Sequence, residues 1–358
     1  MDIRQILKEV KNHNAPDVHI MVGQPPVVRL PNGEVYVSPD VQVLTREDVE
    51  GVIQEVTPAD KLEVFREKFE VDFSFTLEGE GGDSGARFRV NLYMEKNGPA
   101  LAFRLIPYEI PDALKFGVPE VVMNLAGLPR GLVLITGPTG SGKSTTLTMI
   151  IDKINRERKA HIITIEDPIE FIHKSGQSIV TQRELGSHTK SFPSAIKASL
   201  RQDPDVVMIG EMRDLDTIMA ALTLAETGHL VFSTLHTQDA PQTINRIVDA
   251  FPEFQQQQIQ TQLSLVLKGV VAQTLIPRKD AEGRVCAYEI MLANEGVQSC
   301  IKDGKTHQLY SMMQIGKKEG MRTLDDDLLR LVNEGIVEPE VALSKARDLD
   351  DMKGKLGI

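Results

Sequence analysis

Short continuous apolar runs separated by amphipathic stretches dominate the chain beyond about residue 118. Apolar runs of this length are typical of strands covered on both faces by helices. Apolar residues between these runs recur at the three- and four-residue spacing of helices. The alternation predicts an α/β domain with a doubly wound, mostly parallel sheet. The candidate core strands are Leu132–Thr136, Ile162–Glu166, Asp205–Ile209 and Leu230–Thr234, and the helical patterns include Phe192–Leu200 and Leu215–Leu222.

The first 110 or so residues have a different texture, in which Gly and Pro interrupt short strand-like runs. A helical pattern runs from Arg46 to Phe69 and is broken near Pro58. The pattern predicts a smaller α+β domain. The strand-like runs are Val18–Val22, Pro25–Leu30, Ala86–Leu92 and Leu101–Ile106.

The domain boundaries follow from the positions of Gly and Pro. Pro107 and Pro111 disfavour regular structure and bracket a predicted linker. We therefore expect an N-terminal domain over 1–108, a linker over 109–117 and a second domain over 118–358. The Gly-rich segment Glu78–Gly85 predicts a mobile surface turn. Beyond Met321 the apolar spacing predicts small amphipathic helices.

Composition narrows the functional classes. With 358 residues and 41% apolar residues, the chain fits about two soluble globular domains. Its 40 basic and 51 acidic residues give a net charge of −11, so no nucleic-acid partner is expected, although a local basic patch stays compatible with the charge. No apolar run approaches a bilayer span and Met1–Lys8 lacks a signal-like apolar region, which predicts a cytoplasmic protein. Cys286 and Cys300 fit no zinc pattern and are interpreted as core residues.

One segment between a predicted strand and a predicted helix carries a phosphate-binding pattern. It reads Gly137-Pro138-Thr139-Gly140-Ser141-Gly142-Lys143-Ser144 and fits G-x-x-x-x-G-K-[ST] at every defined position. Its glycines let backbone N–H groups converge on phosphate oxygens, and the N-terminus of the helix that starts near Thr145 adds positive potential. Lys143 supplies a cation for the β- and γ-phosphates, and Ser144 a hydroxyl for Mg²⁺. The pattern therefore predicts a site for ATP and Mg²⁺, and the flanking elements disfavour an accidental Gly-rich turn.

Acidic residues end two of the predicted core strands. Glu211 follows the run Asp205–Ile209 as in a Walker B element, where it could hold the Mg²⁺ shell or polarise water. Glu166, Asp167 and Glu170 cluster after another strand. We favour Glu166 and Glu211 as catalytic acids, but spacing leaves open which of them is the general base. The alternative for each is a solvent-exposed acidic residue at the end of a strand, without a catalytic role.

Two histidines, His229 and His236, flank the strand Leu230–Thr234. A histidine near a strand end is most often structural. Two of them beside a core strand of an ATPase-like sheet make a role in sensing the γ-phosphate a candidate. We assign that role to His229.

Arg87, Arg89 and Arg104 lie on strand-like runs of the N-terminal domain. An exposed arginine is usually only solvated. Ring-forming ATPases, however, often take a catalytic cation from another domain or subunit. Arg89 and Arg104 are our candidates for that cation.

Taken in order, these motifs resemble the secretion-type ATPases of the type II secretion and type IV pilus superfamily, most closely its PilT-like retraction branch. The resemblance spans nearly the whole chain. It rests on a Walker A loop at Gly137–Ser144, an Asp box at Thr164–Glu170, a Walker B box at Asp205–Arg213, a His box at His229–His236, the phrase Ser199–Asp205, and Asp17–Ile20 with Pro25, Pro26 and Arg29.

The resemblance implies a PAS-like N-terminal domain, a RecA-like C-terminal domain and a ring of six identical subunits. It implies that ATP binds between the domains and that arginines matching Arg89 and Arg104 approach the phosphates. Hydrolysis would rotate one domain against the other and drive pilin removal through an inner-membrane platform protein. The expected location is cytoplasmic and peripheral at the inner membrane, with other pilus motor ATPases as further candidate partners.

Two features bear on the branch within the superfamily. Assembly ATPases carry an extra N-terminal domain and usually a four-cysteine motif, and this chain as given has neither, which favours the retraction branch. Retraction ATPases commonly carry the motif Ala-Ile-Arg-Asn-Leu-Ile-Arg-Glu, whereas the corresponding segment here is Gly296–Asp303 with Gln298 in place of the first arginine.

Gln298 keeps several alternatives open. They are an ATPase for pilus assembly, secretion or DNA transfer, an accessory paralogue, and a regulator that binds ATP with little turnover. Intact Lys143, Ser144 and Glu211 argue against the regulator, and the net charge argues against a DNA motor.

Overall fold

The computed structural model describes residues 2–13, 15–30, 34–37, 42–79, 85–106 and 110–357. The chain divides into two compact units, Met1–Glu109 with Glu170–Ile172, and Ile110–Ile169 with His173–Ile358. Residues 80–84 of the predicted turn and residues 107–109 at the predicted linker lie outside the described residues. Within the part of the chain that the structure describes, no helix combines the length and apolar character that crossing a bilayer requires.

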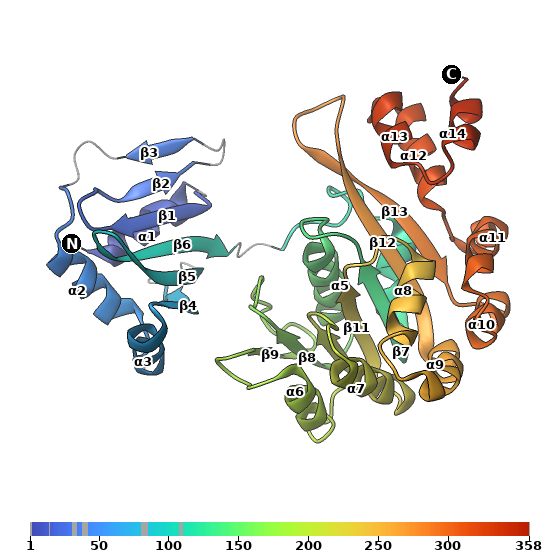
Figure 1. Ribbon diagram of the computed structural model, residues 1–358, viewed down its shortest axis with the longest axis horizontal. Helices are drawn as coiled ribbons and strands as arrows, with labels where there is room; N and C mark the ends of the chain where they lie inside the picture. The colour runs from blue at the N-terminus through green and yellow to red at the C-terminus, as the bar shows by residue number, and fades with distance from the viewer. Residues whose placement is uncertain are drawn as a thin grey trace. The chain divides into compact units, whose positions relative to one another are not determined.

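The first unit contains a six-stranded antiparallel sheet with three helices (Figure 1). Its strand order is β3-β2-β1-β6-β5-β4. The strands predicted from the sequence are present as β1, β2, β5 and β6, whereas β3 and β4 were not predicted. The bounds are α1 Ile3–Asn12, β1 Asp17–Met21, β2 Val27–Arg29, β3 Val35–Val37, α2 Arg46–Val56, α3 Ala59–Lys68, β4 Glu70–Leu77, β5 Ala86–Glu95 and β6 Gly98–Ile106.

Local sequence explains the helix ends and the core of this unit. Thr45 and Asp48 form a reciprocal capping box at the start of α2. Pro58 then separates α2 from α3, as the predicted break requires. Every second residue of a strand, such as Val18 and Ile20 on β1, packs with the helices into one core. The residues between them face away from that core.

The second unit is built on a seven-stranded sheet with the order β13-β12-β7-β11-β10-β8-β9 (Figure 1). Among the described strands, β13 is antiparallel to β12 and the other pairs are parallel, which confirms the predicted mostly parallel sheet. The four predicted core strands are present, while β9, β12 and β13 were not predicted. The bounds are β7 Gly131–Thr136, β8 His161–Glu166, β9 Ile179–Glu184, β10 Val206–Ile209, β11 Leu230–Leu235, β12 Leu267–Pro277 and β13 Arg284–Leu292.

Helices cover both faces of this sheet. Leu132 and Leu134 of β7 belong to the core shared with α6 to α10, whereas Val133 and Ile135 belong to the core shared with α4 and α5. The continuous apolar run of β7 is therefore explained by burial on both faces. The bounds are α4 Glu120–Met123, α5 Lys143–Glu157, α6 Phe192–Ser199, α7 Leu215–Glu226, α8 Ala240–Val248, α9 Glu253–Val266, α10 Glu295–Lys302 and α11 Leu309–Ile315.

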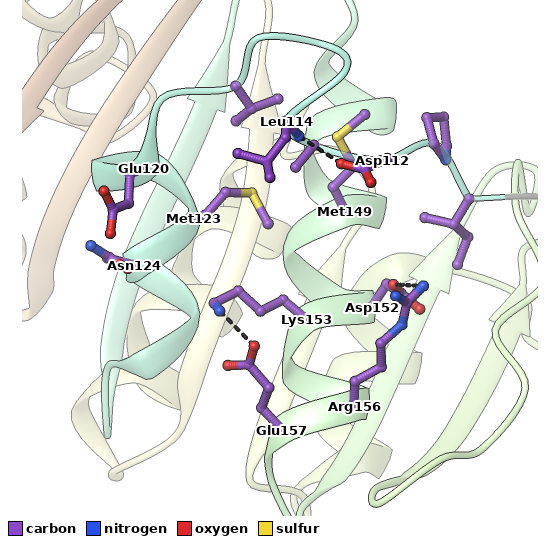
Figure 2. Close-up of a pocket in the computed structure, with 14 residues that line it drawn as sticks. Asp112, Leu114, Glu120, Met123, Asn124, Met149, Asp152, Lys153, Arg156 and Glu157 are labelled. Atoms are coloured by element: carbon purple, nitrogen blue, oxygen red, sulfur yellow. Dashed lines mark hydrogen bonds and ion pairs between the residues drawn. The ribbon is translucent and has the colours of Figure 1, made fainter.

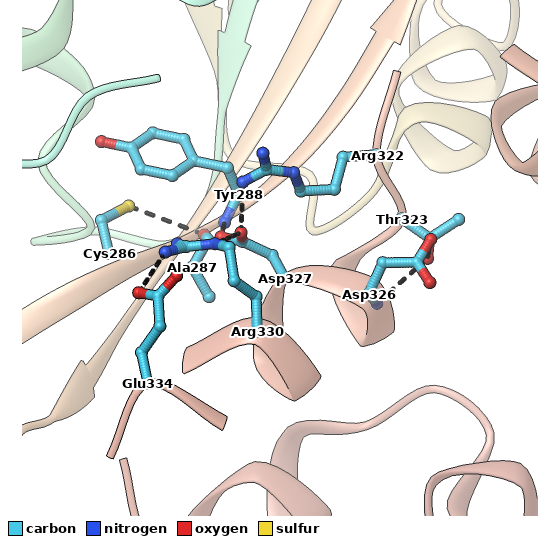
Figure 3. Close-up of polar contacts among 9 residues, drawn as sticks. All are labelled: Cys286, Ala287, Tyr288, Arg322, Thr323, Asp326, Asp327, Arg330 and Glu334. Carbon is cyan, nitrogen blue, oxygen red and sulfur yellow. Dashed lines mark hydrogen bonds and ion pairs between the residues drawn. The ribbon is translucent and has the colours of Figure 1, made fainter. Parts of the chain in front are cut away.

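Three further helices, α12 Leu324–Asn333, α13 Pro339–Lys345 and α14 Leu349–Leu356, pack near the β12–β13 hairpin. Asp327 of α12 is fully buried and accepts hydrogen bonds from Arg322, from Arg330 Nε at 2.8 Å and from the backbone N–H of Tyr288 at 2.8 Å (Figure 3). This buried carboxylate is thus paired with two cations and a backbone donor, which joins α12 to β13. The amphipathic helices predicted beyond Met321 are confirmed, as is the burial of both cysteines.

Candidate nucleotide-binding site

The loop between β7 and α5 has the backbone of a phosphate cradle. Its glycines have φ angles of 139° at Gly137, 77° at Gly140 and 88° at Gly142. A Cβ atom on Gly137 would lie 2.4 Å from the backbone oxygen of Gln273 and 2.6 Å from Ser141 Oγ. Glycine is therefore required at 137 by space as well as by backbone angle.

Lys143, the first residue of α5, crosses this loop. Its Nζ donates to the carbonyl oxygens of Gly137 at 2.8 Å and Pro138 at 3.0 Å, and the side chain is largely buried. Ser144 and Thr145 follow in the first helical turn and are half-buried. The side chain thus starts at the first residue of the helix and places its ammonium at the beginning of the loop.

The polar groups at the loop fit an anionic ligand. Gly142 precedes α5 in the capping position and has no side chain, so the first N–H groups of this 15-residue helix are not capped by a side chain. Ser141 Oγ and Thr136 Oγ1 are buried and have no hydrogen-bond partner among the described residues. Uncapped N–H groups, a lysine and orphaned hydroxyls form a donor set that suits phosphate oxygens.

Glu211 lies two residues after the end of β10, at the same edge of the parallel sheet as the loop. Its Oε1 accepts hydrogen bonds from Arg213 Nε at 2.6 Å and from His236 Nε2 at 3.1 Å. Burial is the largest single influence and raises its pKa, but the hydrogen bonds and charges of Arg213 and His236 together outweigh it and lower the pKa of Glu211. The side chain of Glu211 is therefore held in its ionised form.

Glu166 ends β8, the strand next to β10. Its side chain is buried and accepts hydrogen bonds from Thr164 Oγ1 at 2.6 Å and Gln182 Nε2 at 3.2 Å. The carboxyl ends of adjacent parallel strands meet at one edge, and Gly210 N–H donates to Ile165 O at 2.8 Å. The fold thus brings Glu166 and Glu211 to the same edge as the phosphate loop.

The two histidines lie at opposite ends of β11. His229 precedes the strand, and its Nδ1 lies 3.0 Å from Leu224 O and 3.1 Å from Thr227 Oγ1. A six-residue strand spans roughly 20 Å, so His229 sits far from the loop at the other edge of the sheet. The prediction that His229 acts at the phosphates is therefore wrong for this unit. His236, which contacts Glu211, occupies the loop edge instead.

The candidate arginines belong to the first unit, where Arg89 and Arg104 lie directly opposite each other on β5 and β6. Arg104 Nε donates to Asp17 Oδ1 at 2.7 Å, and this hydrogen bond raises the pKa of Arg104. Arg89 lies 4.0 Å from Asp72. Both guanidinium groups are exposed on this unit. Their catalytic role stays a prediction.

A pocket of about 650 Å³ lies away from the loop, between the start of the second unit and the later turns of α5 (Figure 2). The two basic groups that line it are both paired, Arg156 with Asp152 at 2.5 Å and Lys153 with Glu157 at 2.6 Å. Burial raises the pKa of Asp152, although Arg156 opposes this. The pairs leave this pocket no surplus of cations for a triphosphate.

Sequence reasoning missed several supporting residues of the site. Thr164 stands two residues before Glu166 on one strand, so the period of two already placed both side chains on one face. Gln273 had no such signal, because the hydrogen bond from its side chain to Thr146 joins residues far apart in the chain.

A phosphate loop between a buried parallel strand and a helix, with carboxylates at the ends of neighbouring strands, defines a P-loop nucleotide-binding protein. The chain belongs to the family described as "Type II/IV secretion system protein", whose model matches residues 1–344.

Relatives resemble the chain over nearly its whole length. It is 43% identical to the type IV pilus retraction ATPase PilT of Pseudomonas aeruginosa over 97% of this chain and 98% of that protein. It is 45% identical to a twitching motility protein of Neisseria gonorrhoeae over 86% of this chain and 81% of that one. A crystal structure of the pilus retraction motor PilT with bound ADP matches with a TM-score of 0.89 and 43% identity, covering 98% of both chains.

Proposed function

We propose that this chain is an ATP-hydrolysing motor that retracts type IV pili. The observation that carries the proposal is the intact phosphate loop with Glu211 and Glu166 at the same edge of the sheet. The likeness to a retraction ATPase over almost the whole of both chains supports the same activity and cargo.

Each residue of the site has a role in this proposal. Gly137, Pro138, Thr139, Gly140, Ser141, Gly142, Lys143, Ser144 and Thr145 bind the phosphates of ATP through the backbone, the ammonium and the hydroxyls. Ser144 and Glu211 would hold Mg²⁺, which would supply positive charge to offset that of the phosphates. The carboxylates of Glu166 and Glu211 are both candidates to orient the attacking water. The lowered pKa of Glu211 keeps that carboxylate charged for this role.

His236 replaces His229 as the residue that senses the γ-phosphate. Its Nε2 contacts Glu211, so a change at the carboxylate reaches the segment between β11 and α8 directly. Arg89 and Arg104 supply positive charge from the N-terminal domain. Asp17, the cross-strand neighbour of Arg104 on β1, accepts a hydrogen bond from its Nε at 2.7 Å and orients the guanidinium group.

At the scale of the assembly, we propose a homohexamer that engages an inner-membrane platform protein. The domains would be 1–108 and 118–358 with a linker over 109–117, and hydrolysis would rotate one against the other. This places the protein in the cytoplasm at the inner membrane.

The experiment is ATP turnover of the purified chain with Mg²⁺, beside Glu211→Gln, with particle mass measured in the same buffer. We expect a six-subunit particle whose turnover falls about 100-fold in the variant, since a charge at the reaction centre is lost while the shape is kept. Nucleotide affinity should stay within about threefold. Unchanged turnover would move the catalytic role to Glu166, and a wild-type particle that binds ATP without turnover would favour a regulator.

Gln298 supports a second candidate, an accessory motor of the same class. It lies half-buried on α10, where the retraction branch commonly has an arginine. Replacing residues 296–303 by the common motif in a retraction-null host separates the candidates. A gain of retraction over the unmodified chain would favour the accessory role, and full retraction by the unmodified chain would exclude it.

A further inference from the structure

A buried glutamine lies behind the phosphate loop. Gln273 is on β12, which pairs in parallel with β7 up to Ala272 opposite Thr136, the residue before the loop. The residue is almost completely buried. Its backbone oxygen occupies the space that a Cβ on Gly137 would need. The loop thus begins in direct contact with Gln273.

The side chain of Gln273 reaches the other end of the loop. Its Nε2 donates to Thr146 Oγ1 at 2.8 Å. Thr146 is three residues after Lys143 in the first turn of α5, and its N–H donates to Gly142 O at 3.0 Å. One residue therefore contacts both the start of the loop and the helix turn that closes it.

We propose that Gln273 is a positioning residue of the nucleotide site, which sets the spacing between Gly137 and the first turn of α5. This inference rests on the proposed nucleotide site and extends it to a residue outside the loop. Lys143 also donates to Gly137 O, so the same spacing decides where the ammonium lies. Gln273 acts through the loop and touches no phosphate.

Gln273 is itself held from behind. Its Nε2 lies 3.5 Å from Cys286 Sγ on β13, and burial raises the pKa of the neighbouring Tyr288 hydroxyl, which stays protonated. The backbone N–H of Tyr288 donates to Asp327 (Figure 3). The amide thus contacts β13 of the hairpin, and β13 in turn is hydrogen-bonded to α12.

The physical reason for a positioning effect is the cost of losing a buried hydrogen bond. Thr146 is buried, so water does not replace the Gln273 donor when it is lost, and the Thr146 side chain is left to the neighbouring Tyr288 hydroxyl. The first turn of α5 then shifts to find another partner. That shift moves the N–H groups that would bind phosphate, and nucleotide affinity falls although no phosphate contact was deleted.

The test measures ADP affinity with Mg²⁺ by calorimetry, and thermal unfolding without nucleotide, in the full chain. The variants are Gln273→Leu, Thr146→Val, their double variant and the conservative Thr146→Ser. We expect each of the first two to weaken ADP binding about tenfold, the double variant to be no weaker than either, and Thr146→Ser to bind as the wild type does. Should Gln273→Leu fail to fold, Thr146→Val removes the same hydrogen bond from the helix side.

Thr217→Val is the matched control, because Thr217 is also a buried threonine in the first turn of a helix and donates to Asp214 at 3.1 Å. It should lower the unfolding temperature and leave ADP affinity unchanged. If Gln273→Leu and Thr146→Val behave like this control, Gln273 is only a packing residue and the inference is overturned. Failure of the wild-type chain to bind ADP would instead overturn the proposed function, and this inference with it.

Discussion

At the scale of single residues, the site depends on backbone shape as much as on charge. Gly137 shows this most directly, since its φ of 139° and its contact with the Gln273 carbonyl both exclude a side chain. Lys143 Nζ donates a hydrogen bond to the carbonyl oxygen of Gly137. A residue with no reactive group thus helps to determine where the ammonium lies.

We expect Gly137→Ala to destabilise the fold by about 2–4 kcal/mol, because overpacking and backbone strain add at one position. ADP binding should be lost in the same variant. Urea unfolding followed by circular dichroism measures the change. Gly228→Ala is the control, since Gly228 has a φ of 102° and open space around its Cβ position, and should cost only about 1–2 kcal/mol. Equal costs for the two variants would contradict the close contact at 137.

At the scale of elements, the β12–β13 hairpin connects the loop with the rest of the second unit. Gln273 on β12 faces α5, and Tyr288 on β13 bonds to α12. The buried Glu289 on β13 accepts the N–H of Ala240, the first residue of α8, at 2.8 Å. The segment from His236 to α8 is therefore fixed to the hairpin as well.

Glu289 makes the stability of this arrangement depend on pH. Burial is the main influence and raises its pKa from the ordinary 4.5 to about 7, with a further rise from Asp239, while Arg347 and backbone N–H groups oppose it. The folded state then binds this proton more tightly than the unfolded state. Stability should therefore fall as pH rises from about 4.5 to about 7, and the full loss is present above that window.

We expect Glu289→Gln to be more stable than the wild type at pH 8, by an amount of the order of 2 kcal/mol, and equal to it at pH 5. Gln keeps an acceptor for Ala240 and carries no charge. Denaturant unfolding at both pH values measures this, with the exposed Glu63→Gln as control. An equal effect of Glu289→Gln at pH 5 and pH 8 would show that Glu289 is not titrating in this range.

At the scale of the whole molecule, the chain is two units with separate cores. Among the described residues, the first unit holds one apolar cluster of its own and the second holds three. The phosphate loop and both favoured carboxylates are in the second unit, and the candidate arginines are in the first. The second unit alone should therefore keep nucleotide binding and lose ATP turnover.

We expect a fragment of residues 110–358 to unfold cooperatively and to bind ADP, because its cores and its phosphate loop are complete. ATP turnover should be at background, since Arg89 and Arg104 are missing. Calorimetry and a phosphate-release assay measure the two properties, with Lys143→Ala in the same fragment as the control for binding. Turnover equal to that of the full chain would remove the arginines from the mechanism.

The sequence by itself determined the elements whose signals are local. Continuous apolar runs identified four core strands, and Pro58 marked the break between α2 and α3. The phosphate loop was recognised from eight consecutive residues, because a loop that wraps one phosphate group uses neighbouring backbone. Glu166 and Glu211 were found in the same way, since each ends an apolar strand.

Only the tertiary structure decided which distant residues meet. Strand order placed His236 beside Glu211 and left His229 at the opposite edge, although both flank one strand in the sequence. The β12–β13 hairpin was not predicted from the sequence, because its polar residues Gln273 and Glu289 interrupt the apolar pattern. Both side chains are buried, and other elements provide hydrogen-bond partners for them, Thr146 for the Nε2 of Gln273 and Ala240 for Glu289. Such pairing is a property of the folded chain, and no local pattern encodes it.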